Sequence, residues 1–344
     1  MPMSGLKKVP MSGVKNRLTL ILVAMLLALQ VQARDYRTLY SAEELQRANG
    51  IYSANIEAVL FEDIAQYLLG GELETLQRVT LLQPPDRWKD PFEFSASADA
   101  GLMLIPTLSV KFLDDLAIAI AWFERFGCNK ESLFDYVAAL DFSDRKLPAP
   151  LPALKVPNQA YKLDDYVDDV SQKILKSALA FILLHELGHL HHRHRGYDQI
   201  SAKQAQAQEA EADQFAMRVL RRMRLPPLGA TVWFSAVSMR DPLVPGSPRQ
   251  THPLTSNRLQ AIAAQLRTRP GDFIEPANRG KLTPEGIIAA ADEIERIGNF
   301  LADPDFRSFL RERGRRATPE LLSGACTPEQ HNQQWLERFK DLAQ

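Results

Sequence analysis

The sequence has little net charge, few cysteines and no repeated or low-complexity tract. Its formal net charge is −1 over 344 residues, so no basic excess favours a nucleic-acid partner and we expect none. Cys128 and Cys326 are the two cysteines, so the chain can form at most one internal disulfide bond. They could pair in an oxidising compartment or remain buried thiols, and the sequence leaves both alternatives open. Apolar residues make up 45%, enough for a full hydrophobic core.

The apolar run near the N-terminus, residues 18–31, is shorter than the roughly 20 residues of a membrane-spanning helix. A basic segment without acidic residues precedes it, and Val31-Gln32-Ala33 offers modest side chains where a signal peptidase cleaves. This pattern predicts a signal peptide over residues 1–33 and a periplasmic or secreted protein. An uncleaved membrane anchor is the alternative, and only then do we expect membrane contact. No cysteine follows the run, so a lipoprotein is not expected.

Periodicity and turn signals predict an α+β protein that is mostly helical, with a small sheet before a long central helix. Strands are expected over residues 78–83 and, around a turn at 98–101, over 92–98 and 102–110. The last strand contains Pro106, which cannot donate to a ladder and therefore predicts an edge strand.

Helical spacing recurs through most of the remaining chain. A capping box at Ser41 opens the first helix, and Gly50 could interrupt it. The prolines of residues 143–157 predict a linker or an extended loop. Thr283 and Thr327, each followed by Pro-Glu, indicate later helix starts. Further helices are expected over residues 113–126, 131–140, 163–192, 205–223, 228–239 and 253–266.

Two histidines four residues apart, His185 and His189, lie on one face of the central predicted helix. This spacing lets one nitrogen of each ring reach a single zinc ion at about 2.1 Å. Glu186 is placed beside the metal to take a proton from the attacking water, whose pKa zinc lowers to about 7. The segment His185-Glu186-Leu187-Gly188-His189 is therefore typical of a metallopeptidase.

An apolar stripe at helical spacing leads to His185 and His189, so both rings are expected on a buried face. Buried imidazoles need polar partners, which a metal ion supplies, although a hydrogen-bonded pair of histidines is the other interpretation. Gly188 costs the helix about 1 kcal/mol, which suggests that another element approaches closely there. The small residues Ala212 and Ala216 of the next helix would allow that approach.

A catalytic zinc site has three protein ligands and one open position. A third histidine six residues after His189 is absent, because that position is Arg195. The next predicted helix carries Glu209 and Asp213 on one face. We expect Glu209 to be the third ligand of one zinc ion per chain, and Asp213 to accept a hydrogen bond from a ligand imidazole. Glu211 points about 200° away from Glu209 and is expected in solvent.

Three further histidines, His191, His192 and His194, follow the motif. They could form a secondary metal-binding surface. They could also be the basic end of a helix, where positive side chains suit the helix dipole. Arg193 and Arg195 lie among them and favour the second interpretation.

The motif and the later Glu-x-x-Ala-Asp resemble the gluzincin zinc metallopeptidases. The most similar group contains the CAAX prenyl proteases, the heat-shock membrane protease and periplasmic proteases of outer-membrane assembly. That group also has a His-Pro pair followed by Arg, which His252, Pro253 and Arg258 match. By this resemblance His252 would stabilise the oxyanion and Arg258 would order the site. A plain helix-entry residue before Pro253 is the alternative for His252.

The resemblance covers about residues 92–266 and implies a zincin-like core. It also implies that the strand at 102–110 holds the substrate backbone by strand addition. Residues 127–163 depart from the family as an insertion that could form a lid or restrict the cleft. Together with the other sequence signals, this predicts a signal peptide, an N-terminal helical region, a metallopeptidase domain and a C-terminal helical region, over residues 1–33, 34–91, 92–268 and 269–344.

The sequence thus predicts a zinc-dependent endopeptidase that acts on a protein or peptide substrate, with Glu186 as general base. A zinc hydrolase of a non-peptide substrate stays open, because the ligand set does not encode the bond that is cleaved. A non-catalytic, chaperone-like protein with the same fold is the third alternative, and the presence of the base and every expected ligand disfavours it.

Overall fold

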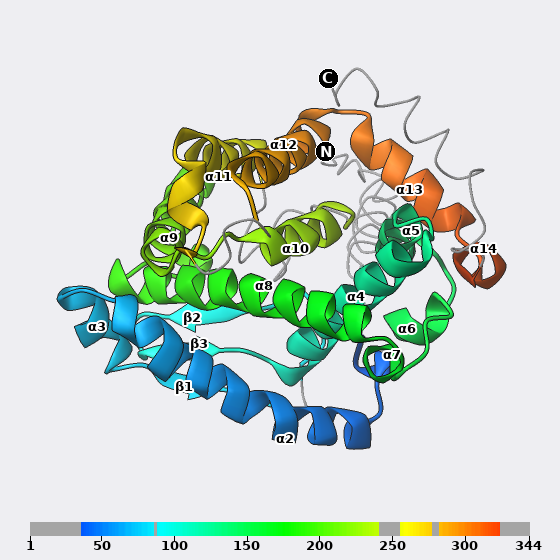
Figure 1. Ribbon diagram of the computed structural model, residues 1–344, viewed down its shortest axis with the longest axis horizontal. Coiled ribbons are helices and arrows are strands. Elements are labelled where there is room, and N and C mark those ends of the chain that lie inside the picture. Colours follow the sequence, from blue (N-terminus) through cyan, green and yellow to red (C-terminus); the bar gives the residue numbers. More distant parts are fainter. Residues whose placement is uncertain (1–35, 86–87, 241–254, 277–281, 324–344) are drawn as a thin grey trace, which may run out of the picture. The chain divides into compact units, whose positions relative to one another are not determined.

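The computed structural model describes residues 36–85, 88–240, 255–276 and 282–323. These form a mostly helical α+β protein with one small sheet, which confirms the predicted fold class (Figure 1). Among the described helices, none combines the length and the apolar character needed to cross a membrane. Cys326, His252 and the helix start at Thr327 lie outside the described residues.

The sheet has three short strands in the order β1-β3-β2. Strand β1 (Thr80–Leu82) pairs in parallel with β3 (Leu102–Leu104), and β2 (Ser95–Ser97) pairs antiparallel with β3. The turn between β2 and β3 places Gly101 at φ 62°, a left-handed conformation that favours glycine. The edge strand beside the central helix is therefore β2.

The prediction of an edge strand over residues 102–110 is wrong. Strand β3 is the central strand and ends at Leu104, and helix α4 (Thr107–Phe126) begins six residues earlier than expected. Pro106 is the N-cap of that helix, with φ −63° and ψ 137°. A proline loses nothing at a helix start, because the first backbone N–H groups of a helix have no partner within it. The signal attributed to a sheet edge was a helix boundary.

The N-terminal region packs across the sheet and the central helix. Helix α2 (Ala42–Ala58) begins at the Ser41 capping box, as predicted, and runs through Gly50 without a break. It continues into η2 (Val59–Ile64) and η3 (Ala65–Tyr67), and a turn leads to α3 (Gly71–Leu76). Leu60 and Ile64 are completely buried in the main core, so this region belongs to the same folded unit as the sheet.

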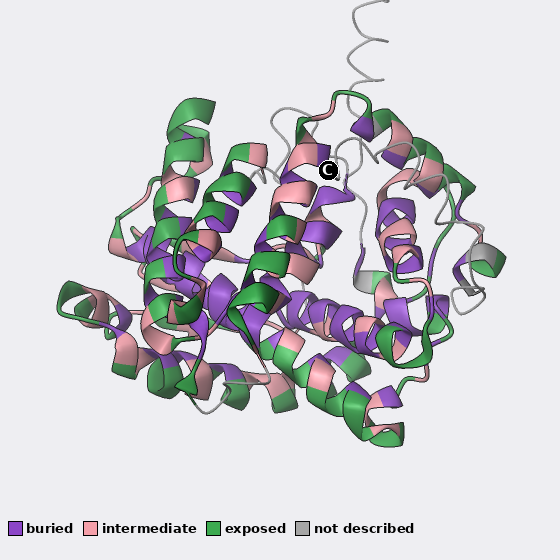
Figure 2. Ribbon diagram, turned by 45° about the horizontal axis from the view of Figure 1, so that its top comes forward, coloured by how far each residue is buried: buried purple, intermediate pink, exposed green. Residues whose placement is uncertain are grey.

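Helix α8 (Asp165–His191) is the central element, and the other helices pack around it (Figure 1). Asp164 caps its N-terminus by accepting from two backbone N–H groups. Every residue from 177 to 190 is buried, as the ribbon coloured by burial illustrates (Figure 2). The helices that follow α8 are α9 (Ala202–Met223), α10 (Leu228–Ser238), α11 (Ser256–Thr268) and α12 (Pro284–Ala302).

The predicted insertion, residues 127–163, is built into a second hydrophobic core. Its helices are α5 (Glu131–Phe142), α6 (Pro150–Ala153) and α7 (Ala160–Leu163), so the predicted proline linker contains one short helix. Figure 1 places them beside the N-terminal half of α8, away from the half that carries His185 and His189. The segment therefore supports the end of α8 opposite the histidines.

Helix α13 (Phe306–Arg316) packs on α5 and adds an ion pair at that contact. Its Arg313 lies between Glu131, at 3.4 Å, and Asp135, at 2.5 Å. Burial, together with the charge of Asp135, outweighs Arg313 and raises the pKa of Glu131 to about 7. The short α14 (Pro319–Ser323) follows.

Candidate metal centre

Helix α8 presents the two histidines of the motif from its last turns. The four-residue spacing puts His185 and His189 on one face, and both side chains are buried at 5% exposure. Their Nε2 atoms lie 3.1 Å apart, with the rings at a steep angle to each other. Two imidazole nitrogens at this distance repel unless a proton or a cation lies between them.

Helix α9 brings the carboxylate of Glu209 to the same point. A capping box at Ser201 starts this helix. The packing of α9 on α8 determines which residues of α9 lie opposite the histidines. That packing is close, because a Cβ added to Gly188 would lie 3.0 Å from the Cα of Ala212 and 3.1 Å from the Cβ of Phe215. The close approach predicted at Gly188 is therefore found, and it holds Glu209 over the two histidines.

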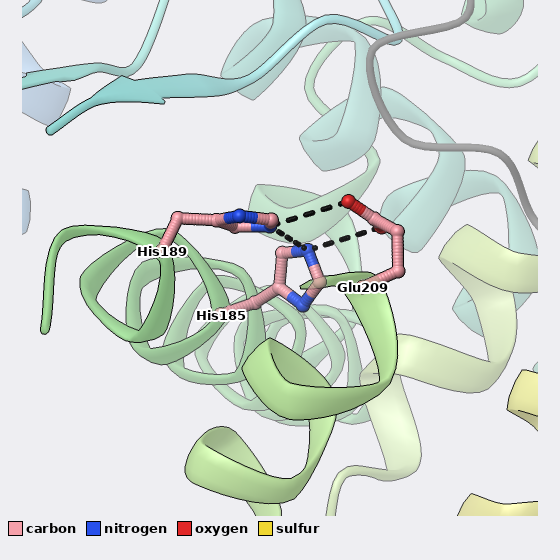
Figure 3. A group of neighbouring side chains, drawn as sticks. All are labelled: His185, His189 and Glu209. Atoms are coloured by element: carbon pink, nitrogen blue, oxygen red, sulfur yellow. Dashed lines mark hydrogen bonds and ion pairs between the residues drawn. The ribbon is translucent and has the colours of Figure 1, made fainter. Parts of the chain in front are cut away.

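The three side chains converge on one centre (Figure 3). The Glu209 carboxylate lies 3.5 Å from Nε2 of His185 and 3.3 Å from Nε2 of His189. The first distance is measured to Oε2 of Glu209 and the second to Oε1, so these two oxygens and the two nitrogens, which lie 3.1 Å apart, surround one centre. A tetrahedral zinc site with bonds of about 2.1 Å has ligand-to-ligand edges of roughly 3.4 Å. The cluster therefore has the dimensions and donor atoms of three zinc ligands.

Asp213, one turn after Glu209, contacts His185 at Nδ1, the ring nitrogen that faces away from the centre. Its Oδ1 lies 3.0 Å from Nδ1 of His185, and Arg258 of α11 donates to both of its carboxylate oxygens at 2.7 and 2.8 Å. Arg258 also lies 2.5 Å from Glu209. Burial raises the pKa of Asp213, but the charge of Arg258 and the hydrogen bonds to it outweigh burial, so that pKa lies below its usual value.

The electrostatics of the cluster favour a positive charge at its centre. Burial alone lowers the pKa of His185, but the hydrogen bonds and negative charges of Asp213 and Glu209 raise it to about 10. The same two carboxylates and Arg258 form a fully buried charged group. Because buried carboxylates need compensating charge, a divalent cation suits the place that the extra proton would occupy.

A histidine beyond the helix contacts the second ring in the same way. The Nδ1 of His194 lies 2.8 Å from Nδ1 of His189, and its Nε2 lies 3.0 Å from a carboxylate oxygen of Glu211. Arg193 adopts a left-handed conformation, φ 54°, and the His194 N–H then donates to the His189 carbonyl at 3.0 Å. This is a Schellman-type helix end, and it folds His194 back over the last turn.

These outer contacts decide which nitrogen of each ligand ring carries its proton. Glu211 can only accept, so His194 donates from Nε2; with a neutral His194 ring, Nδ1 of His194 accepts and His189 donates from its own Nδ1. The Asp213 carboxylate lies 3.0 Å from Nδ1 of His185 and favours a proton on that nitrogen. Both rings are thereby left with an Nε2 lone pair facing the centre, which is the tautomer that a metal ligand needs.

Tyr197, on the short helix η4 (Tyr197–Gln199), completes the surroundings of Glu209. Its hydroxyl hydrogen-bonds to a Glu209 carboxylate oxygen. Burial and the negative charges of Glu209 and Glu186 raise the pKa of Tyr197 above its usual range, so the hydroxyl keeps its proton and can donate. Glu186, the neighbour of His185 in α8, is itself buried at 2% exposure.

The structure thus brings six of the seven predicted site residues together, and the seventh, His252, lies outside the described residues. The sequence interpretation missed two members. His194 was assigned to a plain basic helix end, but its side chain is only 6% exposed and contacts His189. Tyr197 carried no recognisable signal, because its helix η4 is a single short turn without a periodic pattern. Glu211 is in solvent as predicted, and it also holds His194.

Comparison with known proteins adds the class of activity. Residues 129–277 match the model of the Peptidase U49 family. The matched segment includes α8, α9 and α11, and therefore all the described residues of the cluster. This similarity indicates a peptidase. No curated protein and no solved structure matches the chain significantly.

Proposed function

We propose that the chain is a zinc-dependent endopeptidase of the gluzincin type, with His185, His189 and Glu209 as zinc ligands and Glu186 as general base. The observation that carries the proposal is the convergence of two Nε2 atoms, 3.1 Å apart, on the Glu209 carboxylate, whose Oε2 and Oε1 lie 3.5 and 3.3 Å from them, distances that suit the ligands of a tetrahedral ion. The proton positions inferred for both histidines support the same assignment. The peptidase family match supports a peptide substrate.

Zinc bound there would polarise the scissile carbonyl and lower the pKa of water to about 7. The protein supplies the remaining steps. Glu186 accepts a proton from the water as its oxygen bonds to the carbonyl carbon. The same carboxyl then gives that proton to the amide nitrogen as the C–N bond breaks. Arg258 and Tyr197 hold the Glu209 carboxylate from two sides, which keeps the ligand cluster in one geometry. His252 is proposed, from the resemblance alone, to stabilise the oxyanion.

The edge of β2 is proposed as the binding surface for the substrate backbone. In the described part of the sheet, β2 pairs with β3 on one side and lies beside α8. An extended peptide that added to its other side would run past the histidines of α8. This replaces residues 102–110, which the sequence had favoured for that role.

We also propose that residues 1–33 are a signal peptide and that the enzyme acts in the periplasm or after secretion, with a membrane anchor as the alternative. The basic and apolar composition of residues 1–31 supports this. The compact unit that contains all the described residues begins at Tyr36, shortly after the proposed cleavage point. Mass spectrometry of the mature N-terminus is the test, and an intact residue 1 in the exported protein would contradict it.

The central test compares the wild-type chain with Glu186→Gln. We expect about one zinc ion per chain in both, measured by elemental mass spectrometry, and cleavage of casein or of a random peptide library by the wild type alone. Glu62→Gln removes an exposed carboxylate from η2 and is the matched control, which should keep both zinc and activity.

A second pair of variants tests the ligands. His185→Gln should lose the zinc, whereas His192→Gln, an exposed histidine of the following loop, should retain it. Wild-type protein without stoichiometric zinc would refute the metal assignment. Zinc-loaded protein that cleaves neither casein nor any library peptide would refute the peptidase assignment and favour a non-peptide substrate.

A further inference from the structure

A cavity of about 370 Å³ lies at the C-terminal end of α8, between that helix end and the end of the sheet. Residues that precede β1 and β3 and follow β2 form its walls on the sheet side. Leu190 and Arg193 close it on the helix side. Leu190 follows His189 in the chain, so the cavity lies at the same end of α8 as the candidate metal centre.

Two arginines give the cavity positive charge, and no carboxylate in the described ranges forms an ion pair with either of them. Arg78 and Arg193 line it, both are exposed, and neither guanidinium takes part in an ion pair or hydrogen bond with another described residue. Asp99, which is also exposed, is the one acidic residue among those that line the cavity. Elsewhere in the described ranges arginines do pair with carboxylates, as Arg222 does with Glu72.

The position of the cavity relates it to the proposed substrate path. Ala98 and Asp99 come directly after β2, so a peptide lying along the β2 edge reaches the cavity where that strand ends. A side chain or chain end that leaves the β2 edge at this point would enter between the two arginines. Guanidinium groups bind carboxylates with directed, charge-assisted hydrogen bonds.

We infer that this cavity is a specificity subsite that binds a carboxylate of the peptide substrate through Arg78 and Arg193. The inference rests on the proposed peptidase function and adds a substrate class to it. The carboxylate has two sources, an aspartate or glutamate side chain or the free C-terminus of the peptide. Asp99 lies in the same cavity and weakens the attraction, which allows a bound carboxylate to leave after cleavage.

The test is cleavage of a randomised peptide library by the zinc-loaded, full-length protein. We expect enrichment of an acidic residue, or of a free C-terminus, at one fixed distance from the scissile bond. Changing that glutamate to glutamine, or amidating the C-terminus, in one selected peptide then distinguishes the two sources. The change that removes the bound carboxylate should lower kcat/KM about tenfold.

Variants of the arginines assign the preference to the cavity. Arg78→Met and Arg193→Met should each lower kcat/KM for the acidic peptide about tenfold and leave its neutral counterpart unchanged. Asp99→Asn should strengthen the acidic preference. Arg311→Met, an exposed arginine of α13 outside the cavity, is the matched control and should change neither peptide. Arg78→Glu should shift the preference toward lysine, a gain that misfolding cannot imitate.

The outcomes separate this inference from the proposed function. Cleavage without any acidic or C-terminal preference would overturn the subsite and leave the peptidase assignment intact. A preference that survives both arginine variants would also overturn it. Absence of cleavage by zinc-loaded wild-type protein would overturn both.

Discussion

Removal of His194 tests the outer contacts of the metal centre most directly. In the structure its buried ring links Glu211, at 3.0 Å, to Nδ1 of His189, at 2.8 Å. His194→Ala removes the acceptor that fixes the proton of His189, and the ring can then rotate or exchange tautomers. Loss of such a partner lowers metal affinity by about 10- to 100-fold, which corresponds to roughly 1.4 to 2.7 kcal/mol of binding free energy.

Glu211→Gln should have a smaller effect than His194→Ala. The carboxylate is 57% exposed, so water can replace part of its contact with the His194 ring. We expect a loss of a few-fold in zinc affinity, because the ring itself stays in place. Comparison of the zinc affinities of His194→Ala and Glu211→Gln therefore shows which of the two contacts determines the tautomer of His189.

Zinc affinity is measured by competition with a chromophoric chelator at constant pH, and circular dichroism verifies the fold of each variant. Arg195→Ala is the control, since it follows His194 in the chain and is exposed, whereas the ring of His192 stacks on that of His194. An affinity of His194→Ala within twofold of the wild type would refute the argument from the tautomer. If His194→Ala and the control lost zinc affinity equally, the cause would be a disordered helix end and not the lost contact with His189.

Three further predictions concern packing and pH. Gly188→Ala should gain about 1 kcal/mol of helix propensity and yet bind zinc more weakly. The added Cβ would lie 3.0 Å from the Cα of Ala212 and push α9, which carries the carboxylate ligand, away from α8. Unchanged zinc affinity would contradict this. Gly229→Ala should destabilise the fold by about 3 kcal/mol in denaturant titrations, since its Cβ would lie 1.9 Å from the Ile174 carbonyl oxygen; a loss below about 1 kcal/mol would contradict it. The pKa of Glu131 is about 7 in the folded protein against an ordinary 4.5, so between these pH values the carboxyl binds a proton when the protein folds. The contribution of Glu131 to the stability of the wild type therefore falls as the pH rises from 4.5 to 7. Glu131→Gln lacks this loss and should gain roughly 2 kcal/mol over the wild type across that window, which denaturant titrations at several pH values measure; a constant difference would refute the pKa.

The elements with strong local signals were predictable. The length and position of α8 follow from its apolar periodicity, and Gly188 indicated the close packing with α9 that the structure has. The grouping of His185, His189 and Glu209 could be anticipated because helical geometry fixes which residues share a face. These inferences were possible because they depend only on the helical repeat and on one contact between α8 and α9, which follow each other in the chain.

The errors occurred where local patterns are ambiguous. Pro106 disrupts a strand interior and also suits a helix start, and only the packing of the following helix decides between them. His194 lies outside α8, so helical spacing says nothing of its direction, which the left-handed Arg193 determines. Tyr197 meets Glu209 across a loop that has no periodicity.

The sequence by itself therefore determined the helical α+β class and the chemistry of the candidate ligands, because both depend on short-range spacing. The tertiary structure alone decided which strand is the edge and which residues orient the ligands. It also decided that two arginines without an ion-pair partner in the described ranges line a cavity at the same end of α8. Those features join segments far apart in the chain, and their meeting depends on packing that no local pattern encodes.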